Sequence, residues 1–108
     1  MKMPRFDTVI HAPNRLQICA FLSPLEEAEF QVLREELAVS DSVLSKHIKQ
    51  LEEAGYVKQR KSKVNGRQRT FAYLTEKGRK AFENHVEELK RLLVSDKKAQ
   101  KLTNTDWR

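Results

Sequence analysis

Cysteine, proline and glycine are all scarce in this chain of 108 residues, which has one Cys, three Pro and three Gly. A single cysteine excludes an internal disulfide framework and fits a reducing compartment, so we expect a cytoplasmic protein. The few prolines and glycines exclude a loop-rich or low-complexity chain. No apolar run approaches the ~20 residues that span a membrane, and we expect no secretory signal at the N-terminus. These absences favour one globular domain.

Motifs for catalysis are also missing. We find no Gly-rich phosphate loop, paired-carboxylate site or nucleophile motif, so we expect neither an enzyme nor a cofactor. His11, His47 and His85 stand far apart in the sequence and from Cys19, without metal-ligand spacing. His47 lies beside a leucine stripe and is expected to pack or bond locally. Cys19 lies among apolar residues, which predicts a buried thiol, with a redox switch as the alternative.

Charge is abundant and unevenly distributed. The net charge is +6, which favours a polyanionic partner, although many basic proteins bind none. Acidic residues gather in one stretch, and basic residues gather in a later one without an acid between them. The acidic group is Glu26, Glu27, Glu29, Glu35 and Glu36, and the basic group is Lys58, Arg60, Lys61, Lys63, Arg67 and Arg69. The chain therefore has an acidic and a basic side.

The stretch Ser40–Gly55 is the most informative segment. Ser40 is a good N-cap, and Gly55 suits the position after the helix, where positive φ is needed. Leucine, isoleucine and alanine recur on one side of this helix, while serine, lysine and glutamate occupy the opposite side. The apolar side is Leu44, Ile48, Leu51 and Ala54; the polar side is Ser42, Ser45, Lys46, Lys49 and Glu53. Such a helix can lie in a DNA major groove, or can simply expose a solvated face.

Two helices are expected before this segment. Pro13 fits the first position of the first helix, which runs to about Leu22. Leu25–Leu37 is the next helical stretch, and Glu26–Glu29 is where it could break. The short connection Ala38–Val39 then joins it to the following helix, which is typical of a helix-turn-helix.

After Gly55 the apolar period changes to that of strands. Tyr56–Lys63 and Gln68–Leu74 predict two strands, and Asn65–Gly66 between them is a strong hairpin signal because both residues tolerate positive φ. The first strand is nearly all polar beyond Val57, so neither of its faces can be buried there. A two-stranded ribbon with a basic tip after such a helix is the wing of a winged helix.

A long helix is expected from Glu76, after a Thr75 cap, to about Val94. Its apolar residues are spaced as in a coiled-coil seam, which predicts either packing on the first helix or, as we favour, a homodimer interface. The interface residues are Leu16, Phe82, Val86, Leu89, Leu92 and Leu93. We thus expect a winged-helix domain over residues 1–94, with the dimerisation helix from about residue 75. Residues 95–108 would form a polar tail whose one apolar anchor is Trp107.

This order of elements resembles a small, single-domain winged helix-turn-helix transcriptional regulator of the MarR/ArsR-like kind, mainly α with a small β-hairpin. The resemblance rests on Leu33–Lys61, on Arg69–Phe82 with its Leu-Thr-Glu-Lys-Gly motif, and on Val9–Leu22. It implies a homodimer that binds a palindromic operator and usually represses. Family members often carry Gly where this chain has Ala38. The cysteine-containing metal box of ArsR-type sensors is absent from the recognition helix, so metal sensing is not implied.

The expected partner is double-stranded DNA. The recognition helix would present Ser40, Ser42, Ser45, Lys46 and Lys49, with the lysines reaching guanine acceptors or phosphates and the serines bonding base edges of either kind. The wing would present Arg60, Lys61, Lys63, Asn65, Arg67 and Arg69. Arg67 is the candidate for a narrow minor groove, whose negative potential attracts guanidinium. A solvated charged hairpin is the alternative.

Two further functional interpretations remain open. The winged helix could be a protein-interaction module whose basic wing docks an acidic partner, although such a face should show aromatic or leucine anchors. The chain could also be a ligand- or metal-responsive variant of the same regulator, with a small-molecule effector whose site the sequence does not locate.

Overall fold

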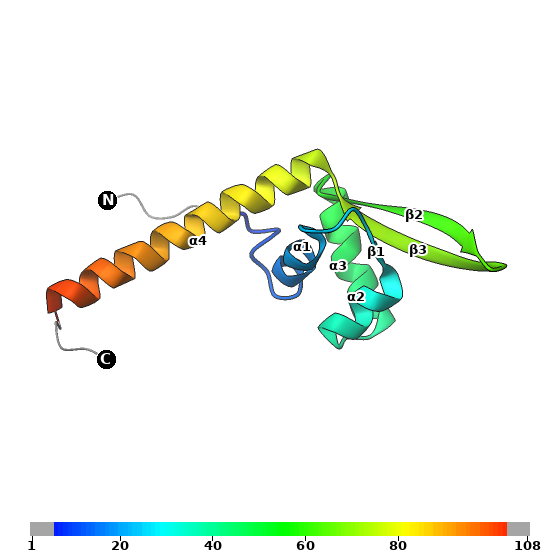
Figure 1. Cartoon of the computed structure of the whole chain (residues 1–108), viewed down its shortest axis with the longest axis horizontal. Helices are drawn as coiled ribbons and strands as arrows, with labels where there is room; N and C mark the ends of the chain where they lie inside the picture. The colour runs from blue at the N-terminus through cyan, green and yellow to red at the C-terminus, as the bar shows by residue number, and fades with distance from the viewer. Residues whose placement is uncertain (1–5, 104–108) are drawn as a thin grey trace.

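The computed structural model describes the backbone of residues 6–103 and the side chains of residues 6–94. Three helices, α1 (Arg15–Leu22), α2 (Phe30–Leu37) and α3 (Asp41–Glu53), pack together at the base of a three-stranded antiparallel sheet. The strands β1 (Ala28–Glu29), β2 (Val57–Val64) and β3 (Arg67–Leu74) lie in the order β1-β3-β2. The long helix α4 (Glu76–Thr103) leaves this helical body on the side opposite to the β2–β3 hairpin (Figure 1). The predicted winged-helix fold is confirmed.

The core forms around α3, as its apolar stripe predicts. Leu44, Ile48 and Leu51 are completely buried, while Ala54 is half-buried. The three buried residues belong to one cluster with side chains from α1, α2 and the base of the sheet. Burying each such side chain contributes about 1.5–3 kcal/mol, so this stripe fixes α3 in place and leaves its other side exposed.

The boundaries of α3 follow the predicted signals. The Ser40 hydroxyl accepts a hydrogen bond of 3.2 Å from the backbone N–H of Val43, which satisfies a free donor of the first turn. Gly55 has a φ of 82° and follows the last turn, where an L side chain would be strained. Before the helix, Ala38 takes the left-handed conformation with a φ of 54°. Ala38 therefore takes, with strain, a conformation that glycine adopts without cost.

We expect Ala38→Gly to stabilise the protein by about 1 kcal/mol, because left-handed backbone costs an alanine roughly 1–2 kcal/mol that glycine does not incur. The residue is exposed, so the loss of one methyl group removes little packing. Chemical denaturation at a fixed protein concentration measures this change. A variant less stable than the wild type would contradict the strain that we assign to the turn.

Three expectations about the boundaries are wrong. Pro13 does not begin α1, because the N-cap is Asn14, whose φ of 69° interrupts the helical path. The stretch Leu25–Leu37 is helical only from Phe30: the break that the sequence allowed at Glu26–Glu29 is present, but the residues before α2 are not helical, and Ala28 and Glu29 pair with Ala72 and Phe71 as strand β1. The last helix does not stop near Val94 but continues to Thr103, since its later residues include good helix formers and no breaker. Trp107 lies outside the described residues.

The hairpin forms as predicted, and its two faces are different. Asn65 and Gly66 both have positive φ, which matches the twist of the strands that they join. Val57, Ala72 and Leu74 are buried on the face toward the helical body, whereas Phe71 and Tyr73 lie half-buried on the outer face. Beyond this base every described residue of the hairpin is at least partly exposed, so the outer part of the ribbon reaches into solvent.

The start of α4 is fixed tightly to the end of α3. The Thr75 hydroxyl donates to the Gly55 carbonyl at 2.6 Å and accepts from the Gly78 N–H at 2.9 Å. The Tyr56 carbonyl accepts from the Thr75 N–H at 2.9 Å. Gly78 packs so closely on this carbonyl that a methyl group at its Cα would lie 2.0 Å from the Tyr56 oxygen. The glycine of the Leu-Thr-Glu-Lys-Gly motif is therefore required by a backbone approach.

Candidate nucleic-acid interface

The outer side of α3 is exposed and carries small or cationic side chains. Ser42, Ser45, Lys46 and Lys49 are all exposed there, on the side opposite to the buried stripe. Ser40 is also exposed, and its hydroxyl lies 3.2 Å from that of Ser42. Every residue that the sequence assigned to the recognition helix is therefore accessible to a partner. Sequence reasoning omitted Val43, which is 39% exposed on the same helix.

Polar contacts between helices hold α3 in place. The Arg15 guanidinium donates to the Gln50 side-chain oxygen at 2.6 Å and to the Val9 carbonyl at 2.6 Å. Asn14 and His47 are joined by a side-chain hydrogen bond of 3.3 Å, which runs from α3 to the N-cap of α1, 33 positions earlier. Burial lowers the pKa of His47, and the nearby Arg15 charge lowers it further. These contacts tie α3 to α1, so the exposed face has a fixed orientation.

The hairpin turns one of its faces toward α3. Every second residue after the buried Val57 lies on the same face of β2, so this face continues from the core through Gln59, Lys61 and Lys63. Gln59 donates to the Glu52 side chain of α3 at 2.9 Å, which places this face beside the recognition helix. Lys61 and Lys63 are exposed further out along the same face. They belong to the same side of the molecule as the lysines of α3.

Arg60 and Arg69 lie on the other face of the hairpin and are paired with acids. Arg60 donates twice to Glu27, at 2.7 and 2.5 Å, and its guanidinium lies 4.5 Å from the centre of the Phe71 ring. The hydrogen bond from Arg60 lowers the pKa of Glu27, and the same bond raises that of Arg60. Arg69 pairs with Glu29 at 2.5 Å. These two candidates of the predicted wing are thus engaged within the chain.

The remaining basic side chains of the hairpin have no acid within ion-pair distance among the residues that the structure describes: Lys58, Lys61, Lys63 and Arg67. All four are exposed, and Arg67 directly follows the Asn65–Gly66 tip. The hairpin thus offers uncompensated positive charge from Lys58 at its base to Arg67 at its tip.

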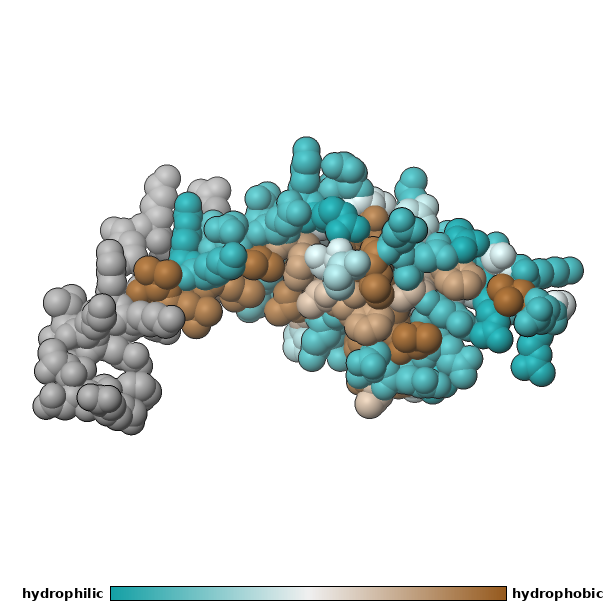
Figure 2. Space-filling model, in the orientation of Figure 1, coloured by the Kyte–Doolittle hydropathy of each residue, from teal (hydrophilic) through white to brown (hydrophobic). Residues whose placement is uncertain are grey.

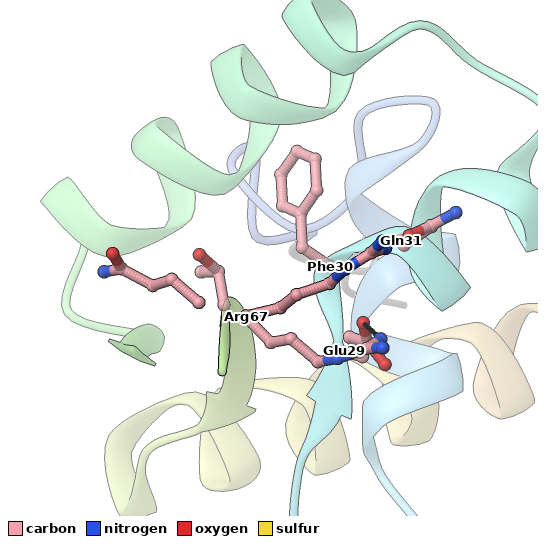
Figure 3. Close-up of a pocket in the computed structure, with 7 residues that line it drawn as sticks. Glu29, Phe30, Gln31 and Arg67 are labelled. Carbon is pink, nitrogen blue, oxygen red and sulfur yellow. Dashed lines mark hydrogen bonds and ion pairs between the residues drawn. The ribbon is translucent and has the colours of Figure 1, made fainter. Parts of the chain in front are cut away.

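An open cavity of about 270 Å³ lies between the start of α2 and the outer part of β3. Glu29, Phe30 and Gln31 line it together with Arg67 (Figure 3). Arg69 is also among the lining residues. Its lining is mainly polar, and one of its two arginines is held by Glu29. We regard it as the junction between the hairpin and the helical body.

The predicted interface on α4 is partly used inside the chain. Leu16 and Phe82 pack against the core, and Val86 and Leu89 are half-buried. Where α4 leaves the helical body its apolar side chains are exposed: Leu92 by 40%, Leu93 by 60% and Val94 by 55%. Figure 2 shows apolar side chains continuing along α4 beyond the body.

One cluster was missed because it joins distant parts of the chain. His11 Nδ1 lies 3.0 Å from His85 Nε2, and the Phe6 ring stacks on His11. Burial lowers the pKa of His85, and the adjacent His11 lowers it further. No group of three metal-ligating side chains occurs among the described residues.

Cys19 is fully buried, and burial raises the pKa of its thiol to about 12, which disfavours the reactive thiolate and a redox switch.

The helix-turn-helix, its hairpin wing and the long following helix define the class of winged-helix domains. Residues 14–93 match the family model of the winged helix DNA-binding domain, and the chain belongs to that family. The family and the structural neighbours below confirm the resemblance to small MarR/ArsR-like transcriptional regulators. None of the described helices has both the length and the apolar content needed to cross a membrane.

Relatives and solved structures support this placement. An uncharacterized protein of Methanocaldococcus jannaschii is 41% identical over 90 residues, which cover 83% of this chain and 94% of that protein. A transcriptional regulator homologue from Pyrococcus horikoshii OT3 has 29% identity and a TM-score of 0.77, over 82% of this chain and 88% of its own. HlyU from Vibrio cholerae N16961 has 27% identity and a TM-score of 0.59, over 70% of this chain and 78% of its own.

Proposed function

We propose that this protein is a homodimeric, sequence-specific regulator that binds a palindromic operator in double-stranded DNA and represses transcription. The observation that supports this most is the common orientation of two exposed basic surfaces, the outer side of α3 and the α3-facing side of the hairpin. The protein would act in the cytoplasm, where its DNA lies. We assign it no catalytic role, no metal and no cofactor.

In this proposal α3 enters the major groove and the hairpin follows the phosphates. Lys46 and Lys49 contact guanine acceptors or phosphates, while Ser42 and Ser45 bond base edges. Val43 adds an apolar contact suited to a thymine methyl group. Arg67 enters the adjacent minor groove from the hairpin tip. Two copies of α3 would read half-sites about 34–36 Å apart, one turn of DNA.

Selection of bound sequences from random duplex DNA tests the proposal most directly. We expect enrichment of a palindromic motif, and binding to it that weakens by about 10³–10⁵ between 50 and 200 mM salt if six to ten phosphates are contacted. The failure to enrich any motif, together with salt-independent binding, would reject the proposed function.

We expect Lys63→Ala to weaken binding to all duplexes alike and to reduce the slope of log affinity against log salt by about 1, because one phosphate contact is lost. Lys90→Ala removes the same charge from an exposed site on α4 and serves as the control. Fluorescence anisotropy over a salt series measures both slopes. Equal slopes for Lys63→Ala and Lys90→Ala would contradict a wing contact at Lys63.

Two alternatives remain as competing proposals. A protein-interaction module would need apolar anchors on the outer side of α3, yet Val43 is its one large apolar side chain there. A ligand- or metal-responsive regulator would share the fold, with a small-molecule effector as a further partner. Retention of an acidic protein instead of duplex DNA would favour the first alternative.

A further inference from the structure

The outer face of the sheet carries a link from β2 to the segment before α2. Arg60 belongs to β2, and its cross-strand neighbour on β3 is Phe71. The Arg60 guanidinium lies over the Phe71 ring and bonds both oxygens of Glu27, which precedes β1. A bidentate arginine–carboxylate pair fixes direction as well as distance. Arg60 thus spans the central strand and ties the far strand of the hairpin to the helical body.

A second link lies on the same face. Arg69 of β3 bonds Glu29 of β1 at 2.5 Å and lines the cavity at the start of α2 (Figure 3). The backbone pairing between β1 and β3 is short, because it joins only Ala28 to Ala72 and Glu29 to Phe71. The two ion pairs therefore extend a narrow connection between the hairpin and the body. A long two-stranded ribbon with a short base would otherwise tilt easily.

We propose that Glu27 and Glu29 are positioning residues for DNA binding, which set the angle of the hairpin against α3 and keep Arg60 and Arg69 away from phosphates. This inference rests on the proposed function. The acids hold the hairpin so that Lys61 and Lys63 meet the phosphates and Arg67 meets the adjacent minor groove while α3 occupies the major groove. They also cancel two positive charges that would otherwise attract any DNA sequence. Both effects raise the ratio of specific to non-specific affinity.

Removing both acids should therefore change the two affinities in opposite directions. In Glu27→Gln/Glu29→Gln the freed arginines add up to two phosphate contacts, so non-specific binding should be tighter at low salt than in the wild type. Its slope of log affinity against log salt should steepen by about 2, so that raising the salt from 50 to 200 mM weakens it about tenfold more than it weakens the wild type. On the operator the hairpin is no longer held at its angle to α3, so specific contacts weaken. We therefore expect the ratio of operator to random-duplex affinity to fall roughly 5- to 10-fold.

The full chain is used for the experiment, with the duplex selected from random DNA as operator and a scrambled duplex of equal length. Glu35→Gln/Glu36→Gln removes two exposed acids from α2 and so controls for the change of two in net charge. The exchange variant Glu27→Arg/Arg60→Glu restores the pair in reverse and should regain the ratio that Glu27→Gln loses. Circular dichroism at the binding temperature confirms that each variant is folded.

The outcomes separate this inference from the proposed function. A ratio in folded Glu27→Gln/Glu29→Gln that equals that of Glu35→Gln/Glu36→Gln would overturn the positioning role while leaving operator binding intact. A ratio that falls in Glu27→Gln and fails to recover in the exchange variant would also overturn it, since the pair itself would not be responsible. If the wild type prefers no duplex over the scrambled one, the proposed function itself fails.

Discussion

Gly78→Ala is expected to destabilise the protein by about 3 kcal/mol, at the upper end of the cost of inserting one carbon into a packed site. The added Cβ would lie 2.0 Å from the Tyr56 carbonyl oxygen and 2.7 Å from its carbon. Backbone atoms cannot rotate away as a side chain can, so α4 must move. That movement would strain the hydrogen bonds from Thr75 to the carbonyls of Gly55 and Tyr56. Thermal and urea unfolding at one protein concentration measure the loss, which should lower Tm by roughly 10–20 °C.

Gly66→Ala is the matched control. Gly66 has a φ of 78° but no atom within 4 Å of an added Cβ, so its substitution should cost only the ~1 kcal/mol of left-handed backbone. Gly78 lies in a helix, where alanine is intrinsically favoured over glycine by ~1 kcal/mol. The sign of the Gly78→Ala effect therefore depends on the contact alone. A Gly78→Ala protein as stable as Gly66→Ala, or more so, would contradict the close approach of α4 to Tyr56.

Those parts of the fold that depend on local chemistry could be predicted from the sequence. The Ser40 cap, the stripe Leu44–Leu51 and the Asn65–Gly66 turn act over a few residues, and each has a residue pattern that identifies it. The segment Ala28–Glu29 has no such pattern. Two residues give no alternation, and their conformation as β1 is set by β3, more than forty positions later. A pairing partner at that distance overrides the helical preference of the sequence around it.

The residues of the candidate interface could be predicted from the sequence, but which of its basic side chains are paired with acids could not. The sequence places Arg60 and Arg69 in a basic run, and nothing local distinguishes them from Lys61 and Lys63. The register of β2 on β3 decides which side chains share a face, and the pairing of β1 then brings Glu27 and Glu29 to that face. The His11–His85 contact likewise depends on tertiary packing across 74 positions. Which charges are neutralised within the chain is therefore a property of the fold.

If the proposed homodimer forms through α4, Leu93→Glu is expected to give a monomer and to weaken binding to the proposed palindromic operator by about 10²-fold or more, since bivalent attachment typically contributes 10²–10⁴. Leu93 is 60% exposed where α4 extends beyond the helical body, and Leu92 and Val94 are exposed next to it. A charge there costs the isolated domain little, roughly 0.5 kcal/mol or less, because no core contact is removed. In a dimer the same carboxylate would be desolvated against an apolar partner surface, where an unpaired charge is expensive.

Asn84→Glu supplies the control, because it adds the same charge to an exposed position on the opposite side of the same helix. Sedimentation equilibrium at micromolar concentration should give a dimer for the wild type and Asn84→Glu, and a monomer for Leu93→Glu. Binding to a single half-site should be unaffected in all three proteins, since α3 and the hairpin are unchanged. A Leu93→Glu protein that remains dimeric would place the dimer contact elsewhere. A wild type that is monomeric and still binds the palindrome tightly would remove the need for a dimer altogether.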